Sequence, residues 1–338
     1  MIFRTPSLVF LTLLCGCGDA GPRVVVYSAL DSAFSEPILE DFERESGIDV
    51  QTRFDAESTK TLGLTQAIIS ESKAGNPRCD VFWNNEILNT LRLQRRGILD
   101  VYAAQSHRPF PTRFRSATGH WHGFAARARV LIVNTKIVPS DRRPDSILGL
   151  ADPTWKGRIG IAKPLFGTTA THAACLFEYW GDKNAMAFFN SLKANNVSIE
   201  SGNKQVAMRV GSGKLAFGLT DTDDAIAELE KGMPVQIVYP EAGDDQIGTL
   251  FIPNTLAIIK GSSRAADARR LVEYLLSPAV EKRLAEGPSA QIPLNPNVRA
   301  KVRVKTPADV KVMKVDFEKA VEKWETTAQF LRDDFLGP

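Results

Sequence analysis

The stretch LAFGLTDTDDAIAELEKG, residues 215–232, joins an apolar run typical of a buried strand to a run typical of a helix. Asp221, Asp223 and Asp224 lie where the two runs meet. Other strand-like runs lie at 24–27, 48–54, 80–83, 129–134, 158–162, 235–240 and 249–260. Because helix-like runs alternate with these strands, the sequence predicts an α/β fold.

The predicted helices cover most of the remaining chain. They are expected at about 35–46, 60–72, up to 96, 168–180, 183–195, 222–231, 265–276, 278–286 and 309–331. In the first of them Ser35 is a plausible N-cap and Gly47 a stop signal. Pro253 interrupts the long apolar run at 249–260, and because proline cannot donate to a ladder we expect it at an edge or a crossover.

Length and composition describe an ordinary globular protein with two parts. The chain has 338 residues, which suits two lobes better than one core. Apolar residues make up 43% and charged residues 24%, with a net charge of +3 and no long basic run, so no nucleic-acid partner is expected. Cys79 and Cys175 lie in apolar surroundings and are predicted to be buried, unpaired thiols.

The N-terminus, MIFRTPSLVFLTLLCGC, has the layout of an export signal. One cation is followed by an apolar stretch that is too short to span a bilayer. Residues 14–17 resemble a bacterial lipobox, so we expect a signal peptide over 1–16 and a lipid on Cys17. A plain signal peptide is the alternative, and either one exports the protein.

No motif points to catalysis. The GSGK at 211–214 lacks the remaining residues of a phosphate loop, and no HExxH, GxSxG or zinc-type cysteine spacing occurs. An enzyme that uses Asp223 and Asp224 with a divalent metal for hydrolysis is kept only as a remote alternative.

Several carboxylates follow strands at the edge where α/β proteins bind ligands. Asp31 follows 24–27, Glu86 follows 80–83, and Asp221, Asp223 and Asp224 follow 215–220. Helix capping explains Asp221 well and Asp224 in part. Two carboxylates about 4 Å apart repel by roughly 4 kcal/mol at an effective dielectric of about 20, so the cluster is also a candidate cation site. Both explanations stay open.

A second candidate site would bind an anion. Gly167, Thr168 and Thr169 open a predicted helix after a strand, and Asn203 opens another. Free backbone N–H groups and hydroxyls at a helix start attract anions, although a simple threonine N-cap explains the pattern equally well. Arg127 and Arg129 flank a strand, where either reaches an anion or lies at the surface.

The segments VVVYSALDSAFSEPILEDFERESGIDV, DVFWNNE, GFAARARVLIVN, ADPTWKGRIGIAKPLFGTT and IPNTLAIIKGSSRAADARRLVEYLLS together resemble the extracellular solute-binding proteins of ABC importers. The resemblance covers roughly 23–300 and is strongest to the ferric-iron-binding, transferrin-like branch. It implies a two-lobed periplasmic binding protein type II fold with the ligand in a cleft, no catalysis, a monomer, and a permease and ATPase as partners. The implied lobes are 23–127, then 128–248, with 249–338 returning mainly to the first lobe.

In the ferric-binding branch two adjacent tyrosines, a histidine and a glutamate hold the iron, and an anion completes the shell. The resemblance places Asp223 and Asp224 at the tyrosine positions, Asp31 at the histidine and Glu86 at the glutamate. The anion would fall on Gly167, Thr168, Thr169, Asn203 and Arg127. No cofactor is expected. The expected ligand is Fe(III) or another hard cation with an anion, or else an organic phosphate, phosphonate or thiamine-like solute without metal. A sensor role stays open beside transport.

Overall fold

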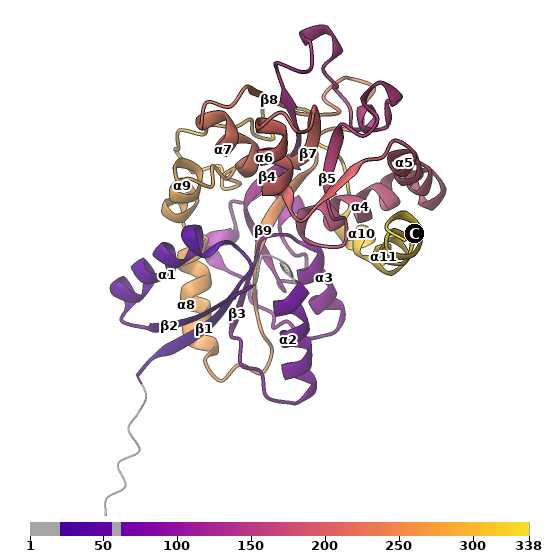
Figure 1. Ribbon diagram of the computed structural model, residues 1–338. Coiled ribbons are helices and arrows are strands. Elements are labelled where there is room, and N and C mark those ends of the chain that lie inside the picture. The colour runs from indigo at the N-terminus through magenta and orange to yellow at the C-terminus, as the bar shows by residue number, and fades with distance from the viewer. Residues whose placement is uncertain (1–20, 56–61, 338) are drawn as a thin grey trace, which may run out of the picture.

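The computed structural model describes residues 21–55 and 62–337. Its strands form one continuous sheet in the order β2-β1-β3-β9-β4-β7-β5-β6, with β8 pairing beside β4. Figure 1 shows helices gathered around the two ends of this sheet, which form two lobes. We call the part around β1, β2 and β3 the first lobe, and the part around β5 to β8 the second lobe.

The first lobe contains the first three strands of the chain, which are parallel, and also two helices from much later in the chain. Its strands are β1 (Arg23–Ser28), β2 (Asp49–Phe54) and β3 (Val81–Asn84). Its helices are α1 (Ser32–Ser46), α2 (Leu62–Lys73), α3 (Leu88–Arg95), α8 (Ala265–Leu275) and α9 (Pro278–Glu286). Gly47 ends α1 in the left-handed conformation, as its sequence position predicts. The N-cap of α1 is Asp31, not Ser35, and Ser35 is buried inside the helix.

The second lobe repeats the alternation of strands and helices. Its strands are β5 (Ile159–Ala162), β6 (Ser198–Glu200), β7 (Phe217–Asp221) and β8 (Val235–Val238). Its helices are α4 (Gly167–Trp180), α5 (Asp182–Ala194), α6 (Asn203–Gly211) and α7 (Thr222–Glu230). Because β5 pairs parallel to both β6 and β7, the helices that follow these strands start at one edge of the sheet.

Two long strands run through both lobes. β4 (His122–Asn134) pairs with β9 (Phe251–Ile258) through its first part and with β7 and β8 through its last part. The sequence predicted only 129–134 of β4, because the preceding Gly, Ala and Arg residues lack the usual strand composition. β9 lies in the centre of the sheet, and Pro253 is tolerated there because the pairing is irregular opposite it, between Phe124 and Arg127.

The C-terminal region packs against both lobes, with contacts to α3 of the first lobe and to α5 of the second, and it differs from its prediction. Helices α10 (Phe317–Glu322) and α11 (Trp324–Phe330) are followed by a π-helical turn at Leu331–Phe335. The single helix expected over 309–331 is wrong in its first part. Met313 N–H donates to Thr249 at 2.9 Å and Thr249 N–H donates to Lys311 at 2.8 Å, so this segment is tied to the sheet in an extended form.

Both cysteines within the described residues are free and buried, as the sequence predicts. Burial raises the pKa of the Cys79 thiol and of the Cys175 thiol, which keeps both thiols protonated and unreactive. They act as small apolar side chains in the core. The expected signal peptide and Cys17 lie outside the described residues.

Candidate functional site

A pocket of about 150 Å³ lies between the two lobes. A cavity needs about 10–15 Å³ of such volume to hold one water molecule. The pocket therefore has room for a small solute of about ten non-hydrogen atoms. The first lobe lines it with Leu30, Asp31, Phe34 and Asn85, and β4 contributes Arg127. The second lobe provides most of the polar lining, including Lys163, Gly167, Thr168, Thr169, Ser201, Asn203, Lys204, Asp221, Asp223 and Asp224.

One end of the pocket, which we call the oxyanion end, is made by two helix starts. α4 begins at Gly167 directly after β5, and α6 begins at Asn203 after β6. Neither helix has a side-chain hydrogen bond at its N-cap, so the backbone N–H groups of both first turns remain available to an anion. Gly167 has φ of +54°, a conformation that favours glycine. Lys163 and Lys204 add positive charge to this lining.

Arg129 fixes the side chains of the oxyanion end through hydrogen bonds. It lies on β4 with no exposed surface, and it donates to Thr168 Oγ1 at 3.1 Å, to Asn203 Oδ1 at 3.1 Å and to Thr169 Oγ1 at 3.2 Å. It also pairs with Asp221 at 2.6 Å. The sequence left Arg129 as an anion ligand or a surface residue, and the structure makes it a buried support instead.

Asp221 is a buried acceptor and does not cap its helix. It makes no side-chain hydrogen bond to the start of α7. Instead it accepts from Thr168 Oγ1 at 2.6 Å and from Asn203 Nδ2 at 3.0 Å, in addition to Arg129. Burial opposes its charged form, but Arg129 and Arg127 together lower the pKa of the Asp221 carboxyl below its usual value. The capping role expected from the sequence is therefore wrong for Asp221.

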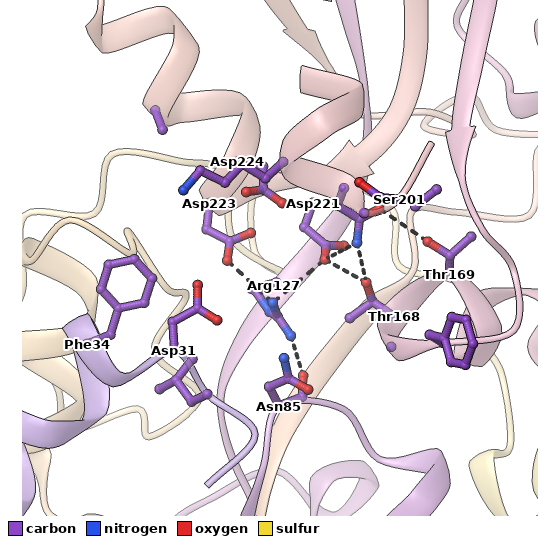
Figure 2. Close-up of a pocket in the computed structure, with 18 of the residues that line it drawn as sticks. Asp31, Phe34, Asn85, Arg127, Thr168, Thr169, Ser201, Asp221, Asp223 and Asp224 are labelled. Carbon is purple, nitrogen blue, oxygen red and sulfur yellow. Dashed lines mark hydrogen bonds and ion pairs between the residues drawn. The ribbon is translucent and has the colours of Figure 1, made fainter. Parts of the chain in front are cut away.

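The opposite end of the pocket, which we call the acidic end, contains the remaining carboxylates. Asp223 and Asp224 lie in the first turn of α7, where the helix dipole favours negative charge. Figure 2 shows Asp31 reaching toward them from the first lobe. The structure thus brings Asp31 to the same pocket as Asp223 and Asp224. One ligand atom from each of Asp221, Asp223 and Asp224 lies within 4.8 Å of the others, close enough to share an ion.

Arg127 lies in the middle of the acidic end, as Figure 2 shows. Its Nη1 is 3.4 Å from Asp223 and 3.7 Å from Asp221, and its Nη2 donates to the backbone carbonyl of Asn85 in the first lobe. Burial alone would lower the pKa of Arg127, but the carboxylates around it, those of Asp223 and Asp221 above all, raise it above the usual range. The sequence expected Arg127 at the anion, whereas in the structure its side chain pairs with the carboxylates of Asp221 and Asp223.

The structure does not bring Glu86 into the pocket. Its carboxylate accepts from the backbone N–H of Leu88 at 2.5 Å and of Asn89 at 3.0 Å, which are at the start of α3. Thr171 of α4 donates to it at 2.7 Å, so Glu86 also joins the two lobes. These bonds use the oxygens that a ligand would need. Glu86 therefore serves as a helix cap and an interlobe contact.

The position of Arg127 bears on whether a ferric ion fits the acidic end. A carboxylate at about 3.5 Å from a guanidinium gains about 5 kcal/mol at an effective dielectric of about 20. Since a metal ion sits about 2 Å from a carboxylate oxygen, an ion on Asp223 would lie within roughly 6 Å of the guanidinium. At the same dielectric Arg127 alone repels a trivalent ion there by roughly 8 kcal/mol and an amino group by a third of that, which offsets part of the attraction that the carboxylates exert.

Several lining residues were not predicted as ligands. Lys163 directly follows β5, and Ser201 and Lys204 flank the start of α6, so the rule that ligands bind at the carboxyl ends of strands was sufficient to find them. Asn85 follows β3 by the same rule. The prediction favoured the charged neighbour Glu86 over Asn85, although the polar amide is the residue that faces the pocket.

Comparisons with known proteins identify the class. Residues 90–323 match the family described as bacterial extracellular solute-binding protein, and the chain belongs to this family. Its members bind a small ligand outside the cytoplasm and deliver it to an ABC permease and ATPase, so the predicted class is confirmed. The family consists of binding proteins and not of enzymes.

Particular relatives differ in the ligand they are named for. The major ferric iron-binding protein of Neisseria meningitidis serogroup A is 24% identical over 313 residues, 90% of each chain. A putative 2-aminoethylphosphonate-binding periplasmic protein of Salmonella typhimurium is 25% identical over 159 residues, 46% of each chain. The solved structure of AfuA from Actinobacillus pleuropneumoniae, with exogenous fructose-6-phosphate, has a TM-score of 0.82 at 21% identity and covers 94% of this chain and 100% of its own. The likeness to AfuA confirms the predicted two-lobed fold.

Among the described helices, none is both long and apolar enough to cross a membrane.

Proposed function

We propose that this protein captures a small solute through an oxyanion group and delivers it to the permease and ATPase of an ABC importer. The observation that carries the proposal is the convergence of two helix starts, at Gly167 and Asn203, on one interlobe pocket with Lys163 and Lys204 beside them. Backbone N–H groups, helix dipoles and ammonium groups together favour a phosphate-like group at this end.

The first candidate solute is ferric iron, or another hard cation, that is carried with an anion. Ferric-binding relatives support it, and so does the group of three carboxylates within 4.8 Å, because hard cations prefer carboxylate oxygens. The anion would sit at the oxyanion end and the metal at Asp31, Asp223 and Asp224. Against this candidate, Arg127 already pairs with two of the three carboxylates of the group.

The second candidate is an organic phosphate or phosphonate that binds without metal. The relative named for 2-aminoethylphosphonate supports it, as does the size of the pocket. In this arrangement the phosphorus group binds the helix starts, and an amino or hydroxyl group donates to Asp31, Asp223 and Asp224. A carboxylate accepts such bonds strongly because it is charged.

Thermal unfolding of the chain that lacks residues 1–17 tests the proposal. The panel comprises inorganic phosphate, 2-aminoethylphosphonate and fructose 6-phosphate, and Fe(III) citrate with and without phosphate. A ligand at 100 times its Kd stabilises the protein by about 2.7 kcal/mol. Stabilisation by one of the oxyanion ligands supports the proposal. If none of these mixtures raises the Tm, an oxyanion is not what this cleft binds.

The remaining parts of the proposal concern the whole protein. We propose that residues 23–127 and 128–248 form the two closing lobes, that 249–338 returns mainly to the first, and that the chain is a monomer without catalytic activity. A periplasmic location with a lipid on Cys17 agrees with the export signal. Mass spectrometry of the mature protein tests the lipid, since a diacylglyceryl group on an N-terminal Cys17 is absent from a protein that is simply cut.

A further inference from the structure

The acidic end of the pocket contains a cation of its own. Arg127 is paired with Asp223 at 3.4 Å and with Asp221 at 3.7 Å, and these are two of the three carboxylates that lie close enough to share an ion. We propose that Arg127 determines specificity by taking the place of a hard cation, so that the cleft selects an organic oxyanion with amino or hydroxyl groups. This inference rests on the proposed function, because it names the solute class for the same pocket.

Arg127 is a fixed part of the cleft. Its side chain is only 6% exposed, and it is held on two sides. The carboxylates belong to the second lobe, whereas the carbonyl of Asn85 that accepts from Nη2 belongs to the first. Figure 2 shows the guanidinium between these groups. Moving it away would leave the buried Asp221 and the partly exposed Asp223 close together without the cation that lies beside them, so the positive charge stays at this end of the pocket.

Asp221 is unavailable to an ion for a second reason. Arg129 donates to its Oδ1, and Thr168 and Asn203 donate to its Oδ2. A metal ion on Asp221 would compete with these donors for the carboxylate oxygens, and losing the donors would dismantle the support of the oxyanion end. Of the three grouped carboxylates, Asp221 is therefore committed to the protein and Asp223 is shared with Arg127.

The remaining groups suit a hydrogen-bond donor on the solute. Asn85 lines the pocket at 3% exposure, and its Oδ1 has no hydrogen-bond partner within residues 21–55 and 62–337. A buried amide oxygen gains from a donor, and an amino or hydroxyl group supplies one. Such a group carries at most one charge, so the guanidinium repels it far less than it repels a trivalent ion.

The test compares the parent protein with R127Q, using terbium(III) as a hard trivalent probe after dialysis against EDTA. We expect no saturable terbium binding at the cleft of the parent. In R127Q we expect terbium to bind at least about tenfold more tightly, because the carboxylates of Asp221 and Asp223 no longer pair with Arg127. R127K is the matched control, since it keeps the charge and should resemble the parent. Adding D223N and D224N to R127Q should abolish the gain and thereby place the ion at the acidic end.

If R127Q does not fold, the parent protein alone tests whether the cleft binds a hard cation. Terbium or Fe(III) binding by the parent that D223N/D224N removes would overturn the inference, and so would a folded R127Q without any gain. A parent whose terbium signal is absent, or is unchanged by D223N/D224N, supports it. Phosphate and phosphonate ligands are measured in parallel without metal. If none binds, the proposed function fails, whereas metal binding beside intact phosphonate binding contradicts only the assignment of Arg127.

Discussion

The two ends of the pocket use the same residue type in opposite ways. Arg127 and Arg129 lie two residues apart on β4, so both side chains leave the same face of the strand. Arg129 is hydrogen-bonded to Asp221, Thr168, Thr169 and Asn203 and supports the oxyanion end. Arg127 reaches the pocket itself and pairs with the carboxylates of the acidic end. An arginine side chain is thus structural in one place and lines the pocket in the other.

The largest effect is expected from R129M. It removes the nearest cation of Asp221 and leaves that carboxylate, which is 2% exposed, with Arg127 at 3.7 Å as the next cation beside its two neutral donors. Breaking a buried pair in this way costs about 3–5 kcal/mol of unfolding free energy, to be measured by urea denaturation. R127Q should cost less, because its partner Asp223 is 12% exposed and water can solvate it. Equal losses of unfolding free energy in R129M and R127Q would contradict the view that Arg129 is the structural arginine and Arg127 is not.

Acid should lower the free energy of unfolding through buried histidines that are neutral in the folded protein. His172 on α4 is buried, and burial followed by the charge of Arg129 lowers its pKa to about 3. A histidine whose folded pKa is depressed binds more protons when unfolded, so stability falls as pH falls from about 6.5 toward 3. The expected slope is about 1.4 kcal/mol per pH unit for each such histidine.

Denaturation at several pH values compares the parent with H172N. Burial also lowers the pKa of His107 in the first lobe to about 3, so H172N should remove only part of the slope. A stability that does not change between pH 6.5 and 4.5 would mean that these histidines are not held neutral in the folded protein.

D223N/D224N should weaken ligand binding at least tenfold, or by about 1.4 kcal/mol, while the fold persists. The amides keep the shape of the acidic end but lose the charge that attracts an amino group or a cation. Calorimetric titration with the best ligand from the thermal panel measures the change. E230Q is a matched control, because Glu230 ends the same helix and does not line the pocket. An unchanged Kd would make both aspartates helix-start residues only.

The smallest effect is expected from K163A and K204A. Both lysines are exposed at the rim of the oxyanion end, where single charges contribute about 0.2–1 kcal/mol and are screened by salt. Each variant should bind its oxyanion a few-fold more weakly at low salt, and the difference should shrink near 0.5 M salt. A loss that salt does not reduce would mean that the lysines act through shape and not through charge.

The fold was largely predictable because alternating strands and helices leave a strong pattern. The start of α7 after β7, the starts of α4 and α6, and the meeting of Asp31 with Asp223 all follow from the rule for strand ends. Residues 122–128 of β4 were missed because Ala, Gly and Arg are weak strand formers, and their pairing to β9 is a tertiary effect.

The site was less predictable than the fold because its charged side chains pair with residues that are far away in the sequence. Asp221 meets Arg129 across 92 residues, and Glu86 meets Thr171 across 85 residues. A linear pattern shows that a carboxylate follows a strand, but the donor that occupies it comes from a distant segment. For this reason Glu86 and Arg127 were assigned to a ligand, and their partners in the structure belong to the protein itself.

The most direct measurement is calorimetric titration of the parent protein with phosphate- and phosphonate-bearing solutes in the presence of EDTA. The central claim is that Arg127 supplies the positive charge of the acidic end, so the solute binds without metal. We expect saturable binding of at least one amino- or hydroxyl-bearing phosphate or phosphonate, with the same Kd whether or not EDTA is present. Binding that appears only when Fe(III) citrate is added, and is lost when EDTA is restored, would contradict it.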